Sequence, residues 1–404
     1  MKPIKGAIVW ILLTVLALGC TAQPMISPSF EGVERTSTTA QIMTPLPTVW
    51  QFTAPATFVE PLETNCVSVL SEPPLEQNLP GSLMIGRDRF DVNSTSFLET
   101  INPEARYLLL SPDGKWVSAV VEIEHHAKYD IVTRPVNAAE PEYHFLYNGG
   151  HFITVKWVNN QTLLLRIYNP MVEGGFELVL VSPFTNQYQP ILTTYPGLEE
   201  NENVEIELSP DLNRLVYVAY ENNPNTPWFL SQILWDLETN EPVTVLGQAS
   251  TGHVRWSPNG KYLVFNEMEI RDAERFPLRL VVVNAFGEEI VSYEDPDSIV
   301  DYAWSPDSRK IGFKYQEHVA QSDDHFLGVW NIETGEVIKS CLPVDACGQL
   351  VWSPDSRYLA SGSGNKCIRF PGDDEKEHVL FWNLEQQWAI EKTFQNLVDL
   401  EWLP

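Results

Sequence analysis

The chain has 404 residues, a length that suggests two or three domains at about 150 residues per domain. Hydrophobic residues make up 44% and charged residues 20%, a composition that excludes wholesale disorder. The formal net charge of −28 gives a surface that repels phosphate backbones and argues against nucleic-acid binding. The five cysteines are too few for a disulfide-built mini-protein, and no two have Cys-x-x-Cys spacing.

The first residues have the pattern of an export signal. Two lysines precede the apolar run Ala7 to Leu18, which is shorter than the ~20 residues of a membrane-spanning helix, so residues 1–19 are predicted to be a signal peptide. The run ends in Ala17-Leu18-Gly19-Cys20, which resembles the lipobox of bacterial lipoproteins, although Ala17 stands where that family prefers leucine. The resemblance implies acylation of Cys20, which would hold the exported protein on a membrane, facing the periplasm or the extracellular space. An ordinary secretory signal with an incidental cysteine is the alternative.

Residues 20–65 are rich in threonine, proline and serine and show neither helical nor alternating periodicity. Because proline removes amide donors and favours extended backbone, this segment is predicted to be a tether without a fold of its own. The tether would lift the domain that follows, residues 66–404, off the membrane.

A motif recurs seven times in this domain, with copies such as VRWSPNGKYLVFNE at 254 and LVWSPDSRYLASGS at 350. Its anchor positions are separated by 47, 51, 48, 48, 48 and 50 residues; they are Ser111, Val158, Ser209, Ser257, Ser305, Ser353 and Leu403. Each copy predicts an apolar strand, a tight turn, a second strand, a third strand further on and a short fourth strand. Four antiparallel strands per repeat predict an all-β fold of the β-propeller type.

The Trp-Ser-Pro-Asp turns, and the pairs Trp235-Asp236, Trp330-Asn331 and Trp382-Asn383 at the ends of third strands, resemble WD-repeat propellers and the related TolB-type propellers of bacterial envelopes. The resemblance covers nearly everything from Gly81 onward. Only Gly252-His253 matches the Gly-His opening of the eukaryotic repeat, so the His-Ser/Thr-Asp-Trp network of that family is expected to be absent from most blades. Kelch propellers have a similar period, but paired glycines do not recur in every repeat.

The last repeat consists of a single first strand in the segment VDLEWLP at residues 398–404. The segment from Gly81, which precedes the first complete blade, is a candidate for the missing second to fourth strands. Pairing of these segments would close the ring and hide otherwise bare sheet edges. The prediction is a seven-bladed β-propeller closed by N- and C-terminal strands, with Trp402 close to Leu83.

No nucleophile elbow, zinc-protease motif, P-loop or dinucleotide-binding motif is present, so no catalytic residue, cofactor or metal ligand is assigned. The densest metal-like cluster is His125-His126 with nearby carboxylates. Because adjacent strand residues point to opposite faces, a solvated loop is favoured there over a metal site. The tryptophans that recur at one blade position, such as Trp256, Trp304 and Trp352, are expected to pack between blades rather than form an aromatic ligand cage.

Charged residues divide between the two faces of the predicted ring. The turns between first and second strands carry both signs, as in Asp113-Lys115 and Asp355-Arg357. The loops on the opposite face are strongly acidic, and the candidate acidic binding face comprises Glu199, Glu200, Glu267, Glu269, Asp295, Asp323, Asp324, Asp373, Asp374, Trp228 and Phe276. This face would bind a basic partner or divalent cations, with solubility as the alternative explanation.

Four cysteines besides Cys20 would lie in an oxidising compartment, where three pairings exist. The favoured pairing joins Cys341 to Cys347 and Cys66 to Cys367, which would pin the end of the tether to the sixth complete blade. Free buried thiols are the alternative.

Two functional classes remain. The resemblance implies a monomeric, membrane-anchored lipoprotein whose propeller is a platform for an envelope protein or peptide. The alternative is a propeller that binds a carbohydrate or small ligand, with Ca²⁺ or a hydrolytic reaction at its channel. That alternative requires polar residues on the channel-lining first strands, and the candidates are Glu205, Glu207, Arg255, Asp301 and Asp399, which follow no repeated pattern.

Overall fold

The computed structural model describes residues 67–404 except for a set of gaps. The gaps are 72–73, 75–77, 86–87, 102–104, 106, 126–127, 139–140, 149–150, 169–175, 193–205, 222–228, 249–253, 272–273, 296, 317–324, 345–348, 364–376 and 395–399. The signal peptide, Cys20 and the whole tether lie outside the described residues and stay predictions.

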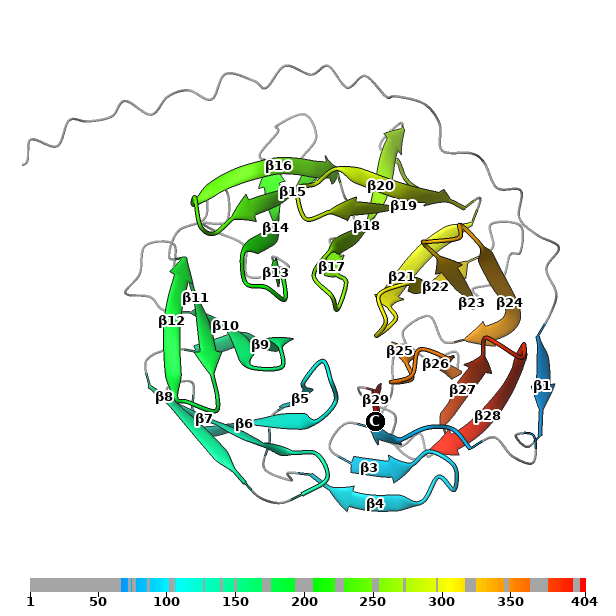
Figure 1. Cartoon of the computed structure of the whole chain (residues 1–404), viewed down its shortest axis with the longest axis horizontal. Coiled ribbons are helices and arrows are strands. Elements are labelled where there is room, and N and C mark those ends of the chain that lie inside the picture. Colours follow the sequence, from blue (N-terminus) through cyan, green and yellow to red (C-terminus); the bar gives the residue numbers. More distant parts are fainter. Residues whose placement is uncertain are drawn as a thin grey trace, which may run out of the picture. The chain divides into compact units, whose positions relative to one another are not determined.

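Within the described residues all 29 elements are strands, and they form seven sheets. The sheets are the blades of a ring in which blades that follow one another in the sequence are neighbours in space (Figure 1). This arrangement confirms the predicted seven-bladed β-propeller.

The first three complete blades occupy the cyan and green part of the ring (Figure 1). Blade 1 comprises β5 (Tyr107–Leu110), β6 (Trp116–Glu124), β7 (Lys128–Pro135) and β8 (Tyr143–Asn148). Blade 2 comprises β9 (His151–Asn159), β10 (Thr162–Tyr168), β11 (Phe176–Ser182) and β12 (Gln187–Leu192). Blade 3 comprises β13 (Ile206–Leu208), β14 (Arg214–Glu221), β15 (Phe229–Asp236) and β16 (Glu241–Gln248).

The next three blades continue around the ring. Blade 4 comprises β17 (Val254–Trp256), β18 (Tyr262–Arg271), β19 (Glu274–Asn284) and β20 (Glu289–Glu294). Blade 5 comprises β21 (Ser298–Trp304), β22 (Lys310–Gln316), β23 (His325–Asn331) and β24 (Val337–Val344). Blade 6 comprises β25 (Leu350–Trp352), β26 (Tyr358–Ser363), β27 (Glu377–Asn383) and β28 (Trp388–Phe394).

The remaining blade, called the closing blade below, is built from two distant segments as predicted. It comprises β29 (Leu400–Leu403), β2 (Ser82–Ile85), β3 (Asp88–Asp91) and β4 (Phe97–Thr100). β29 pairs antiparallel with β2, and Trp402 stands opposite Leu83. Gly81, with φ of 75°, lies against the carbonyl of Leu403, where a side chain would collide with the backbone.

Blade 6 carries a fifth strand that the sequence analysis did not predict. β1 (Ser68–Leu70) pairs in parallel with β28 and covers its edge, with Ser68 opposite Trp388. The neighbouring Val67 is buried in a cluster with Leu327 and Trp382. The folded domain therefore begins at the predicted end of the tether.

The Ser-Pro-Asp turns are held by the anchor serine. In blade 5 the Ser305 hydroxyl donates to Asp307 Oδ1 at 2.6 Å and accepts from the amide of Lys310 at 2.9 Å. The same two bonds recur at Ser111, Ser209, Ser257 and Ser353, and all five serines are buried. These bonds fix the hairpin between the first and second strands in each of these five blades.

The recurrent tryptophans pack between blades, as predicted. Trp304 and Trp352 are 8% and 7% exposed and lie in the hydrophobic clusters between neighbouring sheets. The indole of Trp304 donates to the carbonyl of Arg255 in blade 4 at 2.9 Å, and that of Trp352 donates to the carbonyl of Ala303 in blade 5 at 3.1 Å. Each tryptophan thus fixes the first strand of its own blade against the first strand of the preceding one.

Candidate functional site in the central channel

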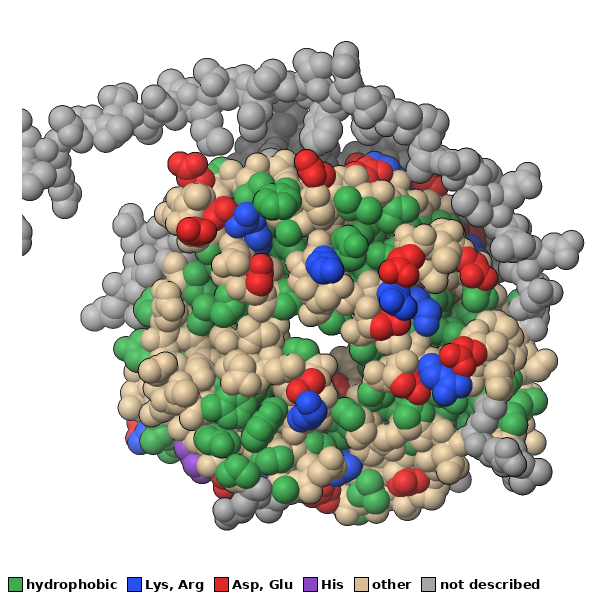
Figure 2. Space-filling model, viewed as in Figure 1, with side chains coloured by type: hydrophobic (Ala, Val, Ile, Leu, Met, Phe, Trp, Pro, Cys, Tyr) green, Lys and Arg blue, Asp and Glu red, His purple; other side chains and the backbone are tan. Residues whose placement is uncertain are grey.

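The first strand of each blade is the innermost (Figure 1). The residues of this strand that face the axis of the ring line the central channel. In β13, β17 and β25 the middle residue is half-buried between two buried neighbours, which is the alternation expected of a strand with one packed face. This middle residue stands two positions before the anchor. Across the seven blades the position holds Leu109, Lys156, Glu207, Arg255, Ala303, Val351 and Glu401. An opening at the centre of the ring, with side chains of both charges around it, is visible in Figure 2.

Three consecutive blades place charged side chains at this position, and the structure brings them together. Lys156 Nζ lies 3.0 Å from Glu207 Oε1, and Arg255 Nη1 lies 3.0 Å from the same oxygen. The side chains of Lys156, Glu207 and Arg255 are 26%, 18% and 38% exposed. One carboxylate oxygen therefore bridges two cations from the blades on either side of it.

A hollow of about 290 Å³ lies beside this row, between blades 2 and 3. Its polar lining comprises Thr154, Lys156, Arg166, Glu207 and Arg255. Its apolar lining comprises Leu164, Leu178 and Ile206, all of them buried. Arg166 on β10 is only 6% exposed and stands opposite Thr154 and Leu178 on the neighbouring strands. The hollow, called the channel pocket below, combines an apolar wall with a strongly polar one.

The structure unites two of the channel residues expected from the sequence, Glu207 and Arg255. Asp301 lies elsewhere on the ring, where its carboxylate accepts from the amide of Tyr302 at 2.8 Å. Glu205 and Asp399 lie outside the described residues. Sequence reasoning missed Lys156 and Arg166. Lys156 was detectable, since it stands two residues before the Val158 anchor just as Glu207 and Arg255 stand before theirs.

Of the candidate acidic binding face, the structure describes the side chains of Glu267 and Asp295. Glu267 is half-buried and accepts from Arg279 Nε at 2.6 Å. Asp295 is only 8% exposed, which corrects the expectation of an exposed loop carboxylate. Lys339 of blade 5 donates to both Asp295, at 2.7 Å, and Asp297, at 2.9 Å, so the carboxylates join two blades.

A tyrosine completes the Asp295 cluster. Tyr293 donates to Asp295 Oδ2 at 2.5 Å. Burial, reinforced by the charge of Asp295, raises the pKa of Tyr293 above its usual value of 10.0. The phenol therefore remains a hydrogen-bond donor over the whole physiological pH range. The remaining members of the acidic face are Glu199, Glu200, Glu269, Asp323, Asp324, Asp373, Asp374, Trp228 and Phe276, and their side chains lie outside the described part of the structure.

The turns between first and second strands carry both charges, as predicted. Lys115 pairs with Asp113 at 3.2 Å, Arg214 with Asp236 at 2.5 Å, and Arg357 with Glu385 at 2.7 Å. The latter two pairs join a residue after the first turn to the end of the third strand in the same blade. Because the Arg357–Glu385 pair is exposed, it contributes little to stability.

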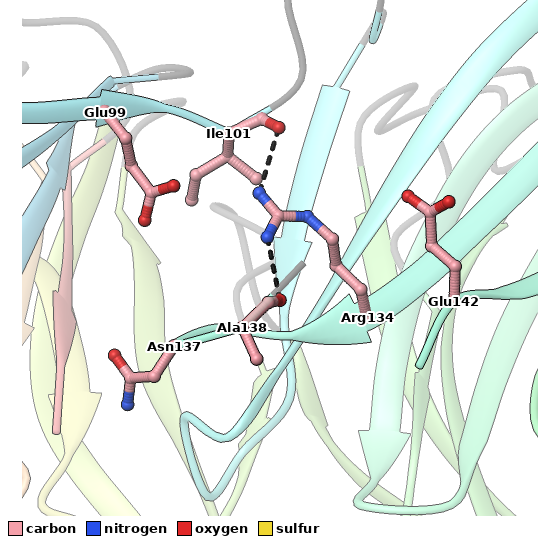
Figure 3. Close-up of a pocket in the computed structure, with 6 residues that line it drawn as sticks. All are labelled: Glu99, Ile101, Arg134, Asn137, Ala138 and Glu142. Carbon is pink, nitrogen blue, oxygen red and sulfur yellow. Dashed lines mark hydrogen bonds between the residues drawn. The ribbon is translucent and has the colours of Figure 1, made fainter. Parts of the chain in front are cut away.

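A second hollow, of about 350 Å³, lies between the closing blade and blade 1 and is lined by Glu99, Ile101, Arg134, Asn137, Ala138 and Glu142. Figure 3 shows the Arg134 guanidinium between two backbone carbonyls, with the Glu142 side chain directed away from it. Arg134 donates to the carbonyls of Ile101 and Ala138, both at 3.0 Å. Arg89 of the closing blade bonds Glu99 at 3.2 Å and Asn137 at 2.7 Å. Both arginines thus fasten the closing blade to blade 1.

His125 is exposed and lies 3.3 Å from Glu122, while His126 is outside the described residues. In the described part of the chain no three His, Cys, Asp or Glu residues are grouped so as to hold a metal ion. No helix there is both long and apolar enough to cross a membrane. Cys341 lies in β24, whereas Cys66, Cys347 and Cys367 lie outside the described residues, so the cysteine pairing stays a prediction.

Comparisons with known proteins agree with this fold. Residues 342–370, which include β25 and β26, match the model of the WD domain, G-beta repeat. No curated protein matches the chain. An oligogalacturonate lyase in complex with manganese is structurally similar, with a TM-score of 0.51 and 15% identity over 77% of this chain and 85% of that one. TolB from Acinetobacter baumannii has a TM-score of 0.44 and 14% identity over 81% of each chain.

The chain is therefore a WD-repeat-like β-propeller. The likeness to the lyase, at its low identity, concerns the fold alone. A propeller of this kind is in general a rigid platform that presents loops and channel residues to a binding partner.

Proposed function

We propose that the protein is a membrane-anchored lipoprotein whose propeller binds an envelope protein or peptide. One observation carries the proposal: a signal-like segment, a lipobox-like Ala17-Leu18-Gly19-Cys20 and a Thr/Pro/Ser-rich tether directly precede a closed propeller in one chain. An acyl anchor and a tether position a platform at a membrane surface. In this proposal the propeller acts as a monomer, binds its partner without a cofactor and catalyses no reaction.

The anchor is tested by metabolic labelling with radioactive palmitate in a bacterial host that processes lipoproteins. We expect the full chain to be labelled and to sediment with membranes, and Cys20→Ala to lose both properties. Cys367→Ala, which removes another cysteine, serves as the matched control and should remain labelled. Equal labelling of Cys20→Ala would contradict the proposal.

The acidic loop face is the proposed contact for a basic partner, since the loops opposite the mixed-charge turns are strongly acidic in the sequence. A lysine-rich peptide titrated into the full chain should bind with an affinity that falls as salt rises. The double variant Asp323→Lys, Asp324→Lys should weaken this binding. The control Glu238→Lys, Glu333→Lys makes the same charge change on exposed turn residues and should leave it unchanged. Calcium-dependent retention of a glycan would instead favour the carbohydrate-binding alternative.

A further inference from the structure

Four aromatic side chains gather where blades 1 and 2 meet, beside the turns that join first to second and third to fourth strands. Both kinds of turn lie on one side of the ring, called the turn face below, because the strands of a blade alternate in direction. Phe184, in the turn between β11 and β12, contacts Trp116 and Tyr143 of blade 1, with ring centroids 4.8 and 5.2 Å away. Trp157 of blade 2 lies 6.2 Å from Phe184. All four side chains are half-buried, so part of each aromatic surface is open to solvent.

The other blades show that this exposure is a local feature. The tryptophans at the position equivalent to Trp157 are at most 8% exposed. They are Trp256, Trp304, Trp352 and Trp402. Phe184 stands two residues after the end of its third strand, and at that position blades 3, 5 and 6 carry Glu238, Glu333 and Glu385. The packing of a propeller therefore requires neither a half-buried tryptophan nor a phenylalanine here.

The turns of blade 2 are also free of charge. Residues 159–162 (Asn-Asn-Gln-Thr) and 182–187 (Ser-Pro-Phe-Thr-Asn-Gln) contain no Asp, Glu, Lys or Arg. The same two turns of blade 5 contain Asp307, Arg309, Lys310, Glu333 and Glu336. On the face shown in Figure 2, charged side chains are sparse over blade 2, at the left of the ring, and hydrophobic side chains gather over the neighbouring blade 1. In a chain of net charge −28, an uncharged aromatic surface favours an uncharged ligand.

The charge-free turns present neutral polar groups as well. Gln161, Asn186 and Gln187 are exposed, and each amide has two N–H donors and one carbonyl acceptor. Tyr188 is 64% exposed. It stands opposite Val181, which packs between blades 1 and 2, so both side chains are on the side of blade 2 that faces blade 1. The surface thus combines aromatic rings with groups that both donate and accept hydrogen bonds.

Hydrogen bonds between the two blades hold this surface in place. The indole of Trp157 donates to the carbonyl of Leu109 in blade 1 at 3.2 Å. Asn160 Oδ1 accepts from the amide of Asp113 in the first turn of blade 1 at 3.0 Å. Because the aromatic rings are positioned before a ligand arrives, little conformational entropy is lost on binding.

A neutral sugar has the chemistry that this surface would recognise. The C–H groups on one side of a pyranose ring form an apolar face that packs on aromatic side chains, and its hydroxyl groups donate and accept hydrogen bonds as amides do. A protein partner, in contrast, usually adds a polar, charged rim to its apolar contacts, and the blade 2 turns offer no charge to pair with it.

We propose that the turn face at the boundary of blades 1 and 2 binds a neutral oligosaccharide. The sugar rings pack on Trp116, Trp157 and Phe184, and their hydroxyl groups bond the amides of Gln161 and Gln187. This surface is separate from the channel pocket and lies on the side of the ring opposite the acidic loop face. Binding requires neither acylation of Cys20 nor calcium, because the blade 2 turns contain no carboxylate.

Titration calorimetry of the full chain in the presence of EDTA tests the site, with cellohexaose, chitohexaose and maltohexaose as separate neutral probes. We expect at least one of them to bind, and a hexamer of galacturonate, the anionic control, to bind at least roughly ten-fold more weakly. Binding of none of the neutral probes at millimolar concentration, equal binding of the anionic hexamer, or binding that requires calcium would overturn the proposal.

Phe184→Glu introduces the residue that blades 3, 5 and 6 carry and should weaken binding of the sugar roughly ten-fold or more. Phe286→Glu makes the same change at the equivalent turn position of blade 4 and should leave the affinity unchanged. Thermal unfolding verifies that both variants are folded. Equal effects of the two substitutions would contradict a site at blades 1 and 2.

Tyr188→Ala keeps the test informative if Phe184→Glu does not fold, because this side chain is largely exposed. It should weaken binding several-fold, whereas Phe97→Ala, which removes a 56% exposed ring from β4 of the closing blade, should not. Capture of an envelope protein that Phe184→Glu abolishes, without binding of any neutral sugar, would assign the surface to a protein contact and overturn the oligosaccharide site.

Discussion

Blade 5 and the closing blade have the same strand order but differ in how their first and second strands are joined. In blade 5, β21 and β22 are connected by a hairpin turn in which Ser305 bonds Asp307 and Lys310. In the closing blade, β29 and β2 come from segments more than 300 residues apart, as the bond between Trp402 and Pro80 illustrates. The backbone ladder nevertheless pairs all four residues of β2 with β29.

Other contacts take the place of the missing turn. The indole of Trp402 donates to the carbonyl of Pro80 at 2.6 Å, and its ring packs edge-on against Phe381 of blade 6 with centroids 5.2 Å apart. The amide of Leu400 donates to Gln349 Oε1 at 2.6 Å. Packing against neighbouring sheets and strand pairing are therefore sufficient to build a blade, and the turn is replaceable.

Deletion of residues 400–404 should have the largest effect, because it removes a whole strand and exposes the paired edge of β2 and the core around Leu83 and Leu400. We expect no cooperative unfolding transition in circular dichroism, and aggregation of the product. The matched control removes β1 by deletion of residues 68–70, which keeps the buried Val67, uncovers the outer edge of β28 and removes the partly buried Leu70. A cooperative transition at the wild-type temperature after deletion of β29 would show that ring closure is dispensable.

Trp402→Ala and Trp304→Ala compare the two blades at equivalent positions. Both side chains are buried, at 6% and 8% exposure, so each truncation should lower the free energy of unfolding by about 3–5 kcal/mol. Hydrogen exchange distinguishes them. Amides of Ser82–Ile85 should exchange faster in Trp402→Ala than in Trp304→Ala, since only Trp402 belongs to the strand that pairs with β2. Equal exchange of these amides in both variants would show that the loss of Trp402 does not weaken the pairing of β2 with β29 locally.

Ser305→Ala tests what the hairpin turn contributes where it is present. The variant removes a buried hydroxyl that donates to Asp307 and accepts from Lys310, and we expect a loss of about 1–2 kcal/mol in denaturant unfolding. Ser94→Ala, on an exposed turn of the closing blade, should change stability by about 0.5 kcal/mol or less. A loss at Ser305 as small as that at Ser94 would mean that the turn bonds contribute little to the stability of blade 5.

The smallest expected effect is a pH dependence at the serine turn of blade 3. Partial burial acts to raise the pKa of Asp211, but hydrogen bonds from Ser209 and Asn213 and the charge of Arg214 outweigh it and hold this pKa below 3.8. Because the folded-state pKa is lowered, the stabilisation is present above pH 3.8 and is lost as the pH falls through the folded-state value.

Asp211→Asn keeps the acceptor of the turn, as Asn259 does in blade 4, and removes the titration. We expect its urea midpoint to fall less steeply than that of the wild type as the pH is lowered. Near neutral pH the midpoints of the two proteins should change with pH to the same extent. Identical acid profiles would show that Asp211 does not titrate differently in the folded state.

The ring, its seven blades and its closure were predictable because a constant period places apolar strands and Ser-Pro-Asp turns at regular intervals. The pairing of β29 with β2 was predictable because the last repeat has only a first strand and lacks three others. Trp402 stands opposite Leu83, as predicted. β1 was not predictable, since Ser68, Val69 and Leu70 carry no repeat signal and pair only because the edge of β28 is near.

The candidate site was predictable only in part. Glu207 and Arg255 were recognised as channel residues. Their contact with each other, and the contact of Lys156 with Glu207, depend on which blades are neighbours in space. Arg166 lies on a second strand that reads as an apolar run, TLLLRIY, so its position beside the channel requires the packed structure. Asp295 lies in the predicted loop between β20 and β21, but its burial was not predictable, because a loop carboxylate gives no sequence signal of the Lys339 ammonium that bonds it.

The pairing of Ser82 with Leu403 has a consequence for the order of the chain itself. Because these two residues are adjacent in one sheet, a short linker could join Pro404 to the segment before β2, and new termini could be opened at an exposed turn such as the one at Gly260. The result would be a circular permutant that keeps seven blades and starts and ends at a turn of blade 4.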